Sequence, residues 1–231
     1  MSDGKKIMVV CSGGLDSTVL LYKAIAEVGK NNVVVLTTYY GSKHNTYERK
    51  MLNWQLNHLN IDNFVELNLT AIWQDNTDCT LLKGNGEVEH KSYAEQVNGK
   101  TPVKTYVPFR NGIFLAAATA EAISWDCQEI WYGAHADDAA GAAYPDCSPT
   151  FVDAMTKAIE FGTADAVTIK APWVNINKSQ VVAEGIKLGM TQEEFHHTRS
   201  CYEDRAEPCR ECGTCLDRAA AFKANGLPEN L

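Results

Sequence analysis

The sequence lacks the features of a nucleic-acid-gripping scaffold and of a membrane protein. Lysine and arginine number 21 against 29 aspartate and glutamate residues, a formal net charge of −8. Faces that grip nucleic acid are usually rich in Lys and Arg, so no direct nucleic-acid partner is expected. No apolar run approaches the roughly 20 residues that cross a bilayer, and the apolar run near the amino terminus is too short for a signal-peptide core. We therefore expect a cytoplasmic protein with no membrane partner.

The sequence also lacks internal repeats and low-complexity segments. Its 231 residues are 45% hydrophobic and 22% charged, which is an ordinary globular balance. Apolar runs and apolar residues at helical spacing indicate alternating strands and helices. We expect strands at residues 5–11, 33–38, 64–69, 129–133 and 167–171. We expect helices at residues 17–28, 46–59, 111–124, 150–162 and 178–189.

This alternation predicts an α/β fold with a doubly wound, five-stranded parallel sheet, in one domain that spans residues 1–231. Residues 73–108 are the least regular part of the chain. A long loop inside a compact domain is uncommon and often functional, so this segment is either a lid or a plain surface insertion. The sequence leaves the oligomeric state open, and a homodimer is compatible with it.

A glycine turn joins the first expected strand to the first expected helix. It reads Ser12-Gly13-Gly14-Leu15-Asp16-Ser17. In a doubly wound sheet this turn lies at the carboxyl end of the strands, where ligands bind. The glycines let the backbone approach an anion, and the helix that follows offers free N–H groups and the positive end of its dipole. The turn therefore predicts phosphate binding, although a plain tight turn with an N-cap is the alternative.

The turn is neither a Walker P-loop nor a dinucleotide fingerprint, because no Gly-Lys-Ser/Thr and no G-x-G-x-x-G is present. It resembles the PP-loop signature S-G-G-x-D-S of N-type ATP pyrophosphatases, which include GMP, NAD and argininosuccinate synthetases and several tRNA-modifying enzymes. The resemblance implies a sheet of the adenine-nucleotide α-hydrolase type. It also implies that residues 12–17 hold the leaving pyrophosphate, and that Asp16 contacts a Mg²⁺ ion on the ATP phosphates.

Four of the eight cysteines crowd together near the carboxyl terminus, at Cys201, Cys209, Cys212 and Cys215. A reducing compartment disfavours disulfides here, so metal is the better interpretation. The spacing lets a folded-over loop place four sulfurs tetrahedrally, as a closed structural Zn²⁺ site needs. An iron–sulfur cluster is the main rival. We expect residues 196–218 to form a small zinc-binding segment that pins the floor of the pocket.

Further segments are similar to motifs of the 7-cyano-7-deazaguanine synthase family, which pairs the PP-loop with a C-terminal four-cysteine motif. Residues 40–44 read Y-G-S-K-H, residues 106–111 Y-V-P-F-R-N and residues 133–138 G-A-H-A-D-D. Residues 144–147 read Y-P-D-C, and Ala171-Pro172 precedes Lys178. The resemblance runs from about residue 7 to residue 218.

The resemblance implies an ATP-dependent carbon–nitrogen ligase of queuosine-type biosynthesis. Its partners are ATP, 7-carboxy-7-deazaguanine and ammonia, and its product is 7-cyano-7-deazaguanine. The acid is first adenylated and becomes the amide, and a second ATP then activates the amide oxygen so that loss of AMP leaves the nitrile.

Residue roles follow from the same match. The expected catalytic residues are Asp16, Arg110 and Lys178. Arg110 suits a carboxylate or the α-phosphate because its planar fork binds two oxygens at once, and a buried ion pair is the alternative. Lys178 suits phosphate, or is simple surface. The expected substrate-binding residues are Arg110, Asn111, His135, Asp138, Tyr144 and Asp146.

These substrate-side residues have structural alternatives. Asp138 and Asp146 suit the N–H edge of a guanine-like ring, or cap a helix or turn near Gly141 and Pro145. His135 contacts ligand or fills a polar core site. Tyr144 stacks on a purine-like ring or only packs.

The sequence departs from the family at Ser42, Tyr47 and Ser148 and by two extra residues within 141–143. We expect these changes to cluster near the substrate. They open a second hypothesis, a diverged relative that stops at the amide or joins the activated carboxylate to another amine. A zinc-bearing nucleic-acid module and a tRNA-thiolating enzyme with an iron–sulfur cluster are further rivals.

Overall fold

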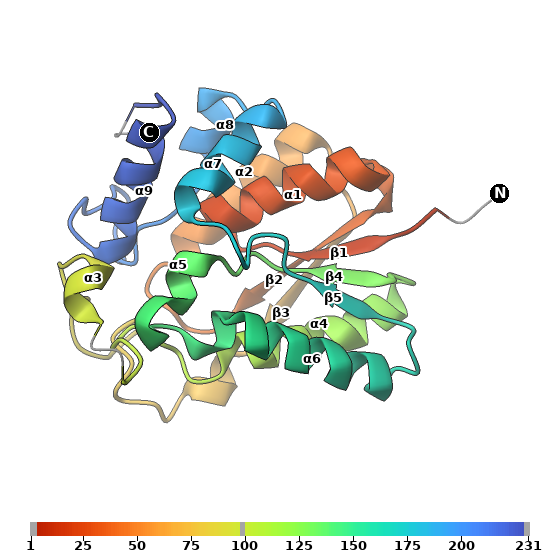
Figure 1. The fold of residues 1–231 in the computed structure, drawn as a ribbon, viewed down its shortest axis with the longest axis horizontal. Coiled ribbons are helices and arrows are strands. Elements are labelled where there is room, and N and C mark those ends of the chain that lie inside the picture. The colour runs from red at the N-terminus through yellow and green to blue at the C-terminus, as the bar shows by residue number, and fades with distance from the viewer. Residues whose placement is uncertain (1–3, 98–99, 229–231) are drawn as a thin grey trace.

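The computed structural model describes residues 4–97 and 100–228, and it confirms the expected sheet (Figure 1). Five parallel strands lie in the order β3-β2-β1-β4-β5. The strands are β1 (Ile7–Val10), β2 (Val33–Tyr39), β3 (Phe64–Asn68), β4 (Glu129–Trp131) and β5 (Thr168–Lys170). The chain runs outward from β1 in one direction and then returns to place β4 on the other side. The strand order therefore reverses between β1 and β4, and a crevice at their carboxyl ends is where such sheets bind ligands.

Helices cover both faces of the sheet, as Figure 1 shows. The longer ones are α1 (Leu15–Val28), α2 (Asn45–Leu59), α4 (Arg110–Ser124), α6 (Pro149–Gly162), α7 (Lys178–Lys187) and α9 (Gly213–Ala224). Shorter ones are α3 (Tyr93–Gln96), α5 (Ala136–Ala139) and α8 (Gln192–His196). Single 3₁₀ turns lie at Lys30–Asn32, Thr70–Trp73, Ala140–Ala142 and Pro145–Cys147. No helix in the described ranges is long and apolar enough to span a membrane.

Alternate residues of the central strands enter two separate cores, because successive side chains of a strand point to opposite faces. In β1, Ile7 and Val9 join a cluster with α1, α2, α7, α8 and α9, whereas Met8 joins a cluster with α4 and α6. In β2, Val33 and Val34 divide in the same way. Strands buried on both faces read as continuous apolar runs, which is why the sequence predicts them well.

The two C-terminal helices α8 and α9 were not expected from the sequence. A local signal exists for α8, since the side chains of Thr191 and Glu194 form a reciprocal capping box at its first turn. Helix α9 begins at Gly213, between Cys212 and Cys215. Because these cysteines indicate a metal site, the start of a helix was not recognised there. All ten predicted strands and helices are present, and no boundary is shifted by more than two residues.

The irregular segment at residues 73–108 forms a long loop whose two ends are joined by a hydrogen bond. Its ends meet where the Trp73 indole N–H donates to the Pro108 carbonyl at 2.9 Å. Leu81 and Val107 pack with Trp73 in a third apolar cluster, and Val88 packs against three of the clustered cysteines. Residues 98 and 99 lie outside the described residues. Closure of this segment over a ligand stays a prediction.

Candidate active site

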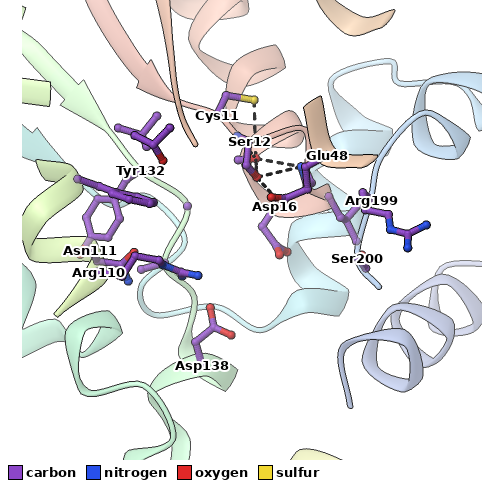
Figure 2. Close-up of a pocket in the computed structure, with 18 of the residues that line it drawn as sticks. Cys11, Ser12, Asp16, Glu48, Arg110, Asn111, Tyr132, Asp138, Arg199 and Ser200 are labelled. Carbon is purple, nitrogen blue, oxygen red and sulfur yellow. Dashed lines mark hydrogen bonds between the residues drawn. The ribbon is translucent and has the colours of Figure 1, made fainter. Parts of the chain in front are cut away.

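A pocket lies at the carboxyl ends of β1, β2 and β4, where the strand order reverses (Figure 2). The glycine turn after β1 forms one wall, and Tyr40 after β2 and Gly133 after β4 form others. Arg110 at the start of α4 and Lys178 at the start of α7 also line it. Residues from widely separated parts of the chain therefore converge at the position that the fold predicts for a ligand.

The glycine turn has a geometry that only glycine at position 13 permits. Gly13 has a φ of +92°, and a Cβ there would lie 2.3 Å from the Glu48 carbonyl oxygen. The Ser12 hydroxyl accepts the Gly14 N–H at 3.1 Å and donates to the Glu48 carboxylate at 2.8 Å. Ser17 closes the turn by donating to the Gly14 carbonyl at 3.2 Å. These hydrogen bonds fix the shape of the turn.

Helix α1 begins directly after this turn and presents its amino end to the pocket. Its N-cap is Gly14, which offers no side-chain acceptor to the first amides of the helix. Leu15, Asp16 and Ser17 all line the pocket. Uncapped amides at the positive end of a helix dipole form a site for phosphate oxygens. The expected phosphate-binding residues are therefore brought together, with Gly13 acting through its backbone shape.

A buried charge network surrounds Asp16. Lys178 Nζ and His135 Nε2 each lie 3.6 Å from Asp16 Oδ2. Burial opposes ionisation of Asp16, but Lys178 and His135 together hold the pKa of its carboxyl well below its usual range. Burial likewise opposes the charge on Lys178, and Asp16 outweighs it and raises the pKa of the ammonium group. Asp16 is therefore ionised at neutral pH, and its buried Oδ1 has no protein partner among the described residues.

Arg110 projects from α4 into the pocket (Figure 2). Its Nη1 donates to the Tyr40 hydroxyl at 3.2 Å, and its guanidinium lies 5.6 and 5.8 Å from the ring centres of Tyr40 and Phe114. Within the described ranges it has no carboxylate within 4.0 Å, and its Nε has no partner. The alternative of a structural ion pair is therefore wrong for the described part of the chain. A fork with free donors is available to an anionic ligand.

Asp138 and His135 occupy different depths of the site. Asp138 lines the pocket, whereas His135 is 1% exposed and is absent from the lining. The Nε2 atom of His135 lies 3.3 Å from Asp138 Oδ2, so one imidazole joins Asp138 and Asp16. The polar-core alternative describes the position of His135, and its role as a ligand contact stays a prediction.

Asn111, Asp146 and Tyr144 form the supporting layer beside Arg110. Asn111 lines the pocket, and its side chain donates to the Asp146 carbonyl at 3.3 Å. The Asp146 carboxylate accepts the Asn111 N–H at 2.9 Å and so caps the first turn of α4. Tyr144 is 5% exposed, and its hydroxyl lies 2.7 Å from that of Thr105. Neither Asp146 nor Tyr144 lines the pocket, so direct ligand contact by either stays a prediction.

The sequence did not predict several residues that line the pocket. Those with polar or aromatic side chains include Tyr40, His44, Glu48, Phe114, Arg199 and Tyr202. Tyr40 and His44 belong to the Y-G-S-K-H motif, which was a usable signal. Glu48 directly follows Tyr47, a position where the sequence departs from the family pattern. Phe114, Arg199 and Tyr202 carry no local signal of their own.

The positions that depart from the family pattern lie outside the lining of the pocket, and their closeness to a bound substrate stays a prediction. None of Ser42, Tyr47, Ser148 or residues 141–143 lines it. The Ser148 hydroxyl accepts the Phe151 N–H and caps α6. The Tyr47 ring lies 4.9 Å from the Arg199 guanidinium. These two changes have local structural roles.

The four clustered cysteines converge as expected. The sulfur atoms of Cys201, Cys209, Cys212 and Cys215 all lie within 4.8 Å of one another. The separation is 3.9 Å between Cys209 Sγ and Cys215 Sγ, close to the roughly 3.8 Å that tetrahedral Zn–S bonds of 2.3 Å require. Backbone N–H groups of Cys209 and Cys212 donate to sulfur, which suits thiolate charge. The donor set therefore fits a closed structural metal site.

Comparison with known proteins agrees with this geometry. The chain is 35% identical over 229 residues to a 7-cyano-7-deazaguanine synthase of Porphyromonas gingivalis, covering 99% of this chain and 97% of the relative. It is 36% identical to one of Archaeoglobus fulgidus, covering 98% and 89%. The solved NMN synthetase of Francisella tularensis has the same fold, with a TM-score of 0.51 at 14% identity over 97% of this chain and 79% of that one. The family model described as queuosine biosynthesis protein QueC matches residues 6–226. The chain therefore belongs to the QueC family.

Proposed function

We propose that this protein converts 7-carboxy-7-deazaguanine and ammonia to 7-cyano-7-deazaguanine with two molecules of ATP. One observation carries the proposal. The amino end of α1 and the Arg110 guanidinium, which has no carboxylate partner among the described residues, face a single pocket, so that two anions are recognised side by side. A ligase that joins a carboxylate to the α-phosphate of ATP needs this pair of sites, and the QueC relatives carry the matching name.

The first step activates the acid. The β- and γ-phosphates bind at the turn of residues 12–17, and Lys178 offsets their charge. The Arg110 fork holds the substrate carboxylate, so that one oxygen attacks the α-phosphorus while the bond to the bridging oxygen breaks and pyrophosphate leaves. The protein supplies position and charge stabilisation, as in other phosphate chemistry.

The later steps reuse the same groups. Ammonia attacks the carbonyl carbon, loses a proton and displaces AMP, which gives the amide. The amide oxygen attacks the α-phosphorus of a second ATP and a second pyrophosphate leaves. Departure of AMP with loss of the two nitrogen protons then leaves the nitrile. Asp138 accepts N–H groups from the guanine-like edge of the substrate, since it lines the pocket as an acceptor-only side chain.

Two metals belong to the proposal. Mg²⁺ accompanies ATP, and the unpartnered Oδ1 of Asp16 is a suitable hard oxygen ligand for it. Mg²⁺ neutralises phosphate charge when bound. Zn²⁺ suits the four cysteines, which leave no open coordination position for catalysis. Elemental analysis of the purified protein tests this assignment, with one zinc per chain expected, and a brown, iron-containing preparation contradicts it.

The decisive experiment is mass spectrometry of a reaction with 7-carboxy-7-deazaguanine, ATP, Mg²⁺ and ammonium. The expected products are the nitrile with AMP and pyrophosphate, each in twofold molar ratio to the nitrile. Accumulation of the amide with one AMP contradicts the proposal and supports the diverged relative. No observation in the pocket favours that alternative, because the departures from the family pattern lie outside its lining.

A further inference from the structure

Arg199 joins the glycine turn to the cysteine segment through its backbone. Its N–H donates to the Gly13 carbonyl at 2.9 Å. Gly14 and Arg199 pair as an isolated parallel β-bridge. A Cβ at Gly14 would lie 3.4 Å from the Arg199 carbonyl oxygen, so the two chains run in close contact. The shape of the turn that begins α1 therefore depends on where the backbone of Arg199 lies.

The side chain of Arg199 points the other way, into the loop between the first and second clustered cysteines. Its Nε donates to the Cys201 carbonyl at 3.2 Å, and its Nη1 donates to the Ala206 carbonyl at 2.9 Å. Its Nη2 donates to the carbonyls of Glu203 and Arg205 at 3.0 and 2.8 Å. One guanidinium thus gathers four backbone carbonyls of residues 201–206. The same loop begins at Cys201, whose sulfur accepts the Cys209 N–H at 3.2 Å, so the loop and the cysteine cluster share this residue.

Arg199 lines the pocket, so phosphate binding is the competing role for its charge. Four observations argue against that role. All three of its nitrogens already donate to carbonyls, and the residue is 4% exposed. The Tyr47 ring lies 4.9 Å from its guanidinium. Figure 2 shows the guanidinium turned away from Asp16 and Asp138. The backbone of Arg199 faces the pocket, and its charge does not.

We infer that Arg199 is a positioning residue that couples metal occupancy of the four-cysteine site to the phosphate affinity of residues 12–17. With metal bound, the 201–206 loop holds the guanidinium, and the Arg199 backbone holds Gly13 and Gly14 in the shape that binds phosphate. The inference rests on the proposed function, in that residues 12–17 bind ATP and the cysteines bind zinc. Coupling of this kind is reciprocal, so ATP must also tighten metal binding.

Two substitutions at this position separate positioning from charge. Arg199→Met removes the fork, and Arg199→Lys keeps the charge but cannot gather four carbonyls. We expect both variants to raise the Kd of Mg·ATP about tenfold, a typical coupling between sites. The exposed neighbour Arg205→Met is the matched control and is expected to leave the Kd unchanged. Titration calorimetry without 7-carboxy-7-deazaguanine measures the Kd. Wild-type affinity in Arg199→Lys overturns the inference, because charge alone then suffices.

The reciprocal measurement does not need a variant to establish the coupling. Equilibrium competition with a zinc chelator gives the zinc affinity of the wild-type chain with and without saturating Mg·ATP. ATP is expected to tighten zinc binding about tenfold in the wild type and by less than twofold in Arg199→Met, under identical conditions that cancel zinc binding by ATP itself. Equal tightening in both chains overturns the inference, as does no tightening in the wild type. Because nitrile formation is not measured, failure of the proposed reaction is distinguishable from failure of the coupling.

Discussion

Lys178 Nζ lies 3.6 Å from Asp16 Oδ2, although the two residues belong to the first turns of different helices. A buried cation in the first turn of a helix opposes the helix dipole, so this placement is unfavourable without partners. Asp16 supplies one partner, and the Asp137 carboxylate accepts the Lys178 backbone N–H at 2.8 Å and supports the same turn. The arrangement holds a positive charge beside the amino end of α1, where the proposed phosphates bind.

Lys178→Met is therefore expected to lower kcat/KM about a hundredfold, because charge stabilisation in a desolvated site is of this order. The ammonium group also holds Asp16 ionised, so the variant weakens the proposed Mg²⁺ ligand at the same time. AMP release under steady-state conditions measures the effect. Lys187→Met, at the exposed end of the same helix, is the control and should retain full activity. A loss of less than threefold in Lys178→Met contradicts the role.

Arg110→Lys is expected to reduce kcat/KM for 7-carboxy-7-deazaguanine about a hundredfold while the Kd of ATP changes little. The lysine keeps the charge but loses the bidentate fork. Tyr40→Phe removes only the hydroxyl that accepts from Nη1, so a smaller loss, of about tenfold, is expected for disturbed orientation. Arg49→Lys, outside the pocket, is the control. If the ATP Kd rises and the acid KM does not, Arg110 serves the α-phosphate instead.

The parts of the site that are contiguous in sequence were predictable. The phosphate turn and the four cysteines each lie within a short stretch, so residue type and spacing alone indicate the chemistry. The central strands β1 and β2 were predictable because each is an apolar run buried on two faces. Lys178 was expected with a surface alternative, and its burial depends on α1 and α5 meeting α7, which a local pattern does not encode.

Side-chain direction across separate elements was not predictable. Asp146 caps α4 through the Asn111 N–H, a contact between segments 35 residues apart, whereas the sequence offered either a ligand role or a cap close to Pro145. Arg199 carries no motif, yet its side chain and backbone join two functional segments. Such residues become visible only once the packing of the elements is known.

Ser148→Ala is expected to destabilise the protein by about 1 kcal/mol without changing the product. Its hydroxyl accepts the Phe151 N–H at 3.2 Å and caps α6, and loss of an N-cap typically costs this much. Urea denaturation measures the free energy of unfolding, and mass spectrometry identifies the product. The exposed Thr150→Ala, in the same helix turn, is the control and should have a smaller effect. Release of amide by Ser148→Ala contradicts a purely structural role.

Glu194 joins three helices on the face opposite α4 and α6. Its Oε2 accepts the Thr191 N–H at 2.6 Å, and its Oε1 accepts the Tyr22 hydroxyl at 2.9 Å. His58 Nε2 lies 3.0 Å from the same Oε1. Burial opposes ionisation of Glu194, but the bonds from Thr191 and Tyr22 outweigh it and lower the pKa of its carboxyl from the ordinary 4.5. The folded state therefore favours the charged carboxylate.

Because the folded pKa lies below the unfolded one, the stability from Glu194 is fully present above about pH 4.5 and is lost as the pH falls through the folded value. Glu194→Gln should therefore lower the free energy of unfolding at pH 7 by about 1.5–3 kcal/mol, the range for hydrogen bonds to a charged group. The difference from the wild type should shrink towards pH 3, where protonation weakens the same bonds in the wild type. Urea denaturation at both pH values measures this. Glu193→Gln, on the exposed side of α8, should show no such dependence, and a Glu194→Gln deficit that stays constant with pH assigns the effect to packing instead of charge.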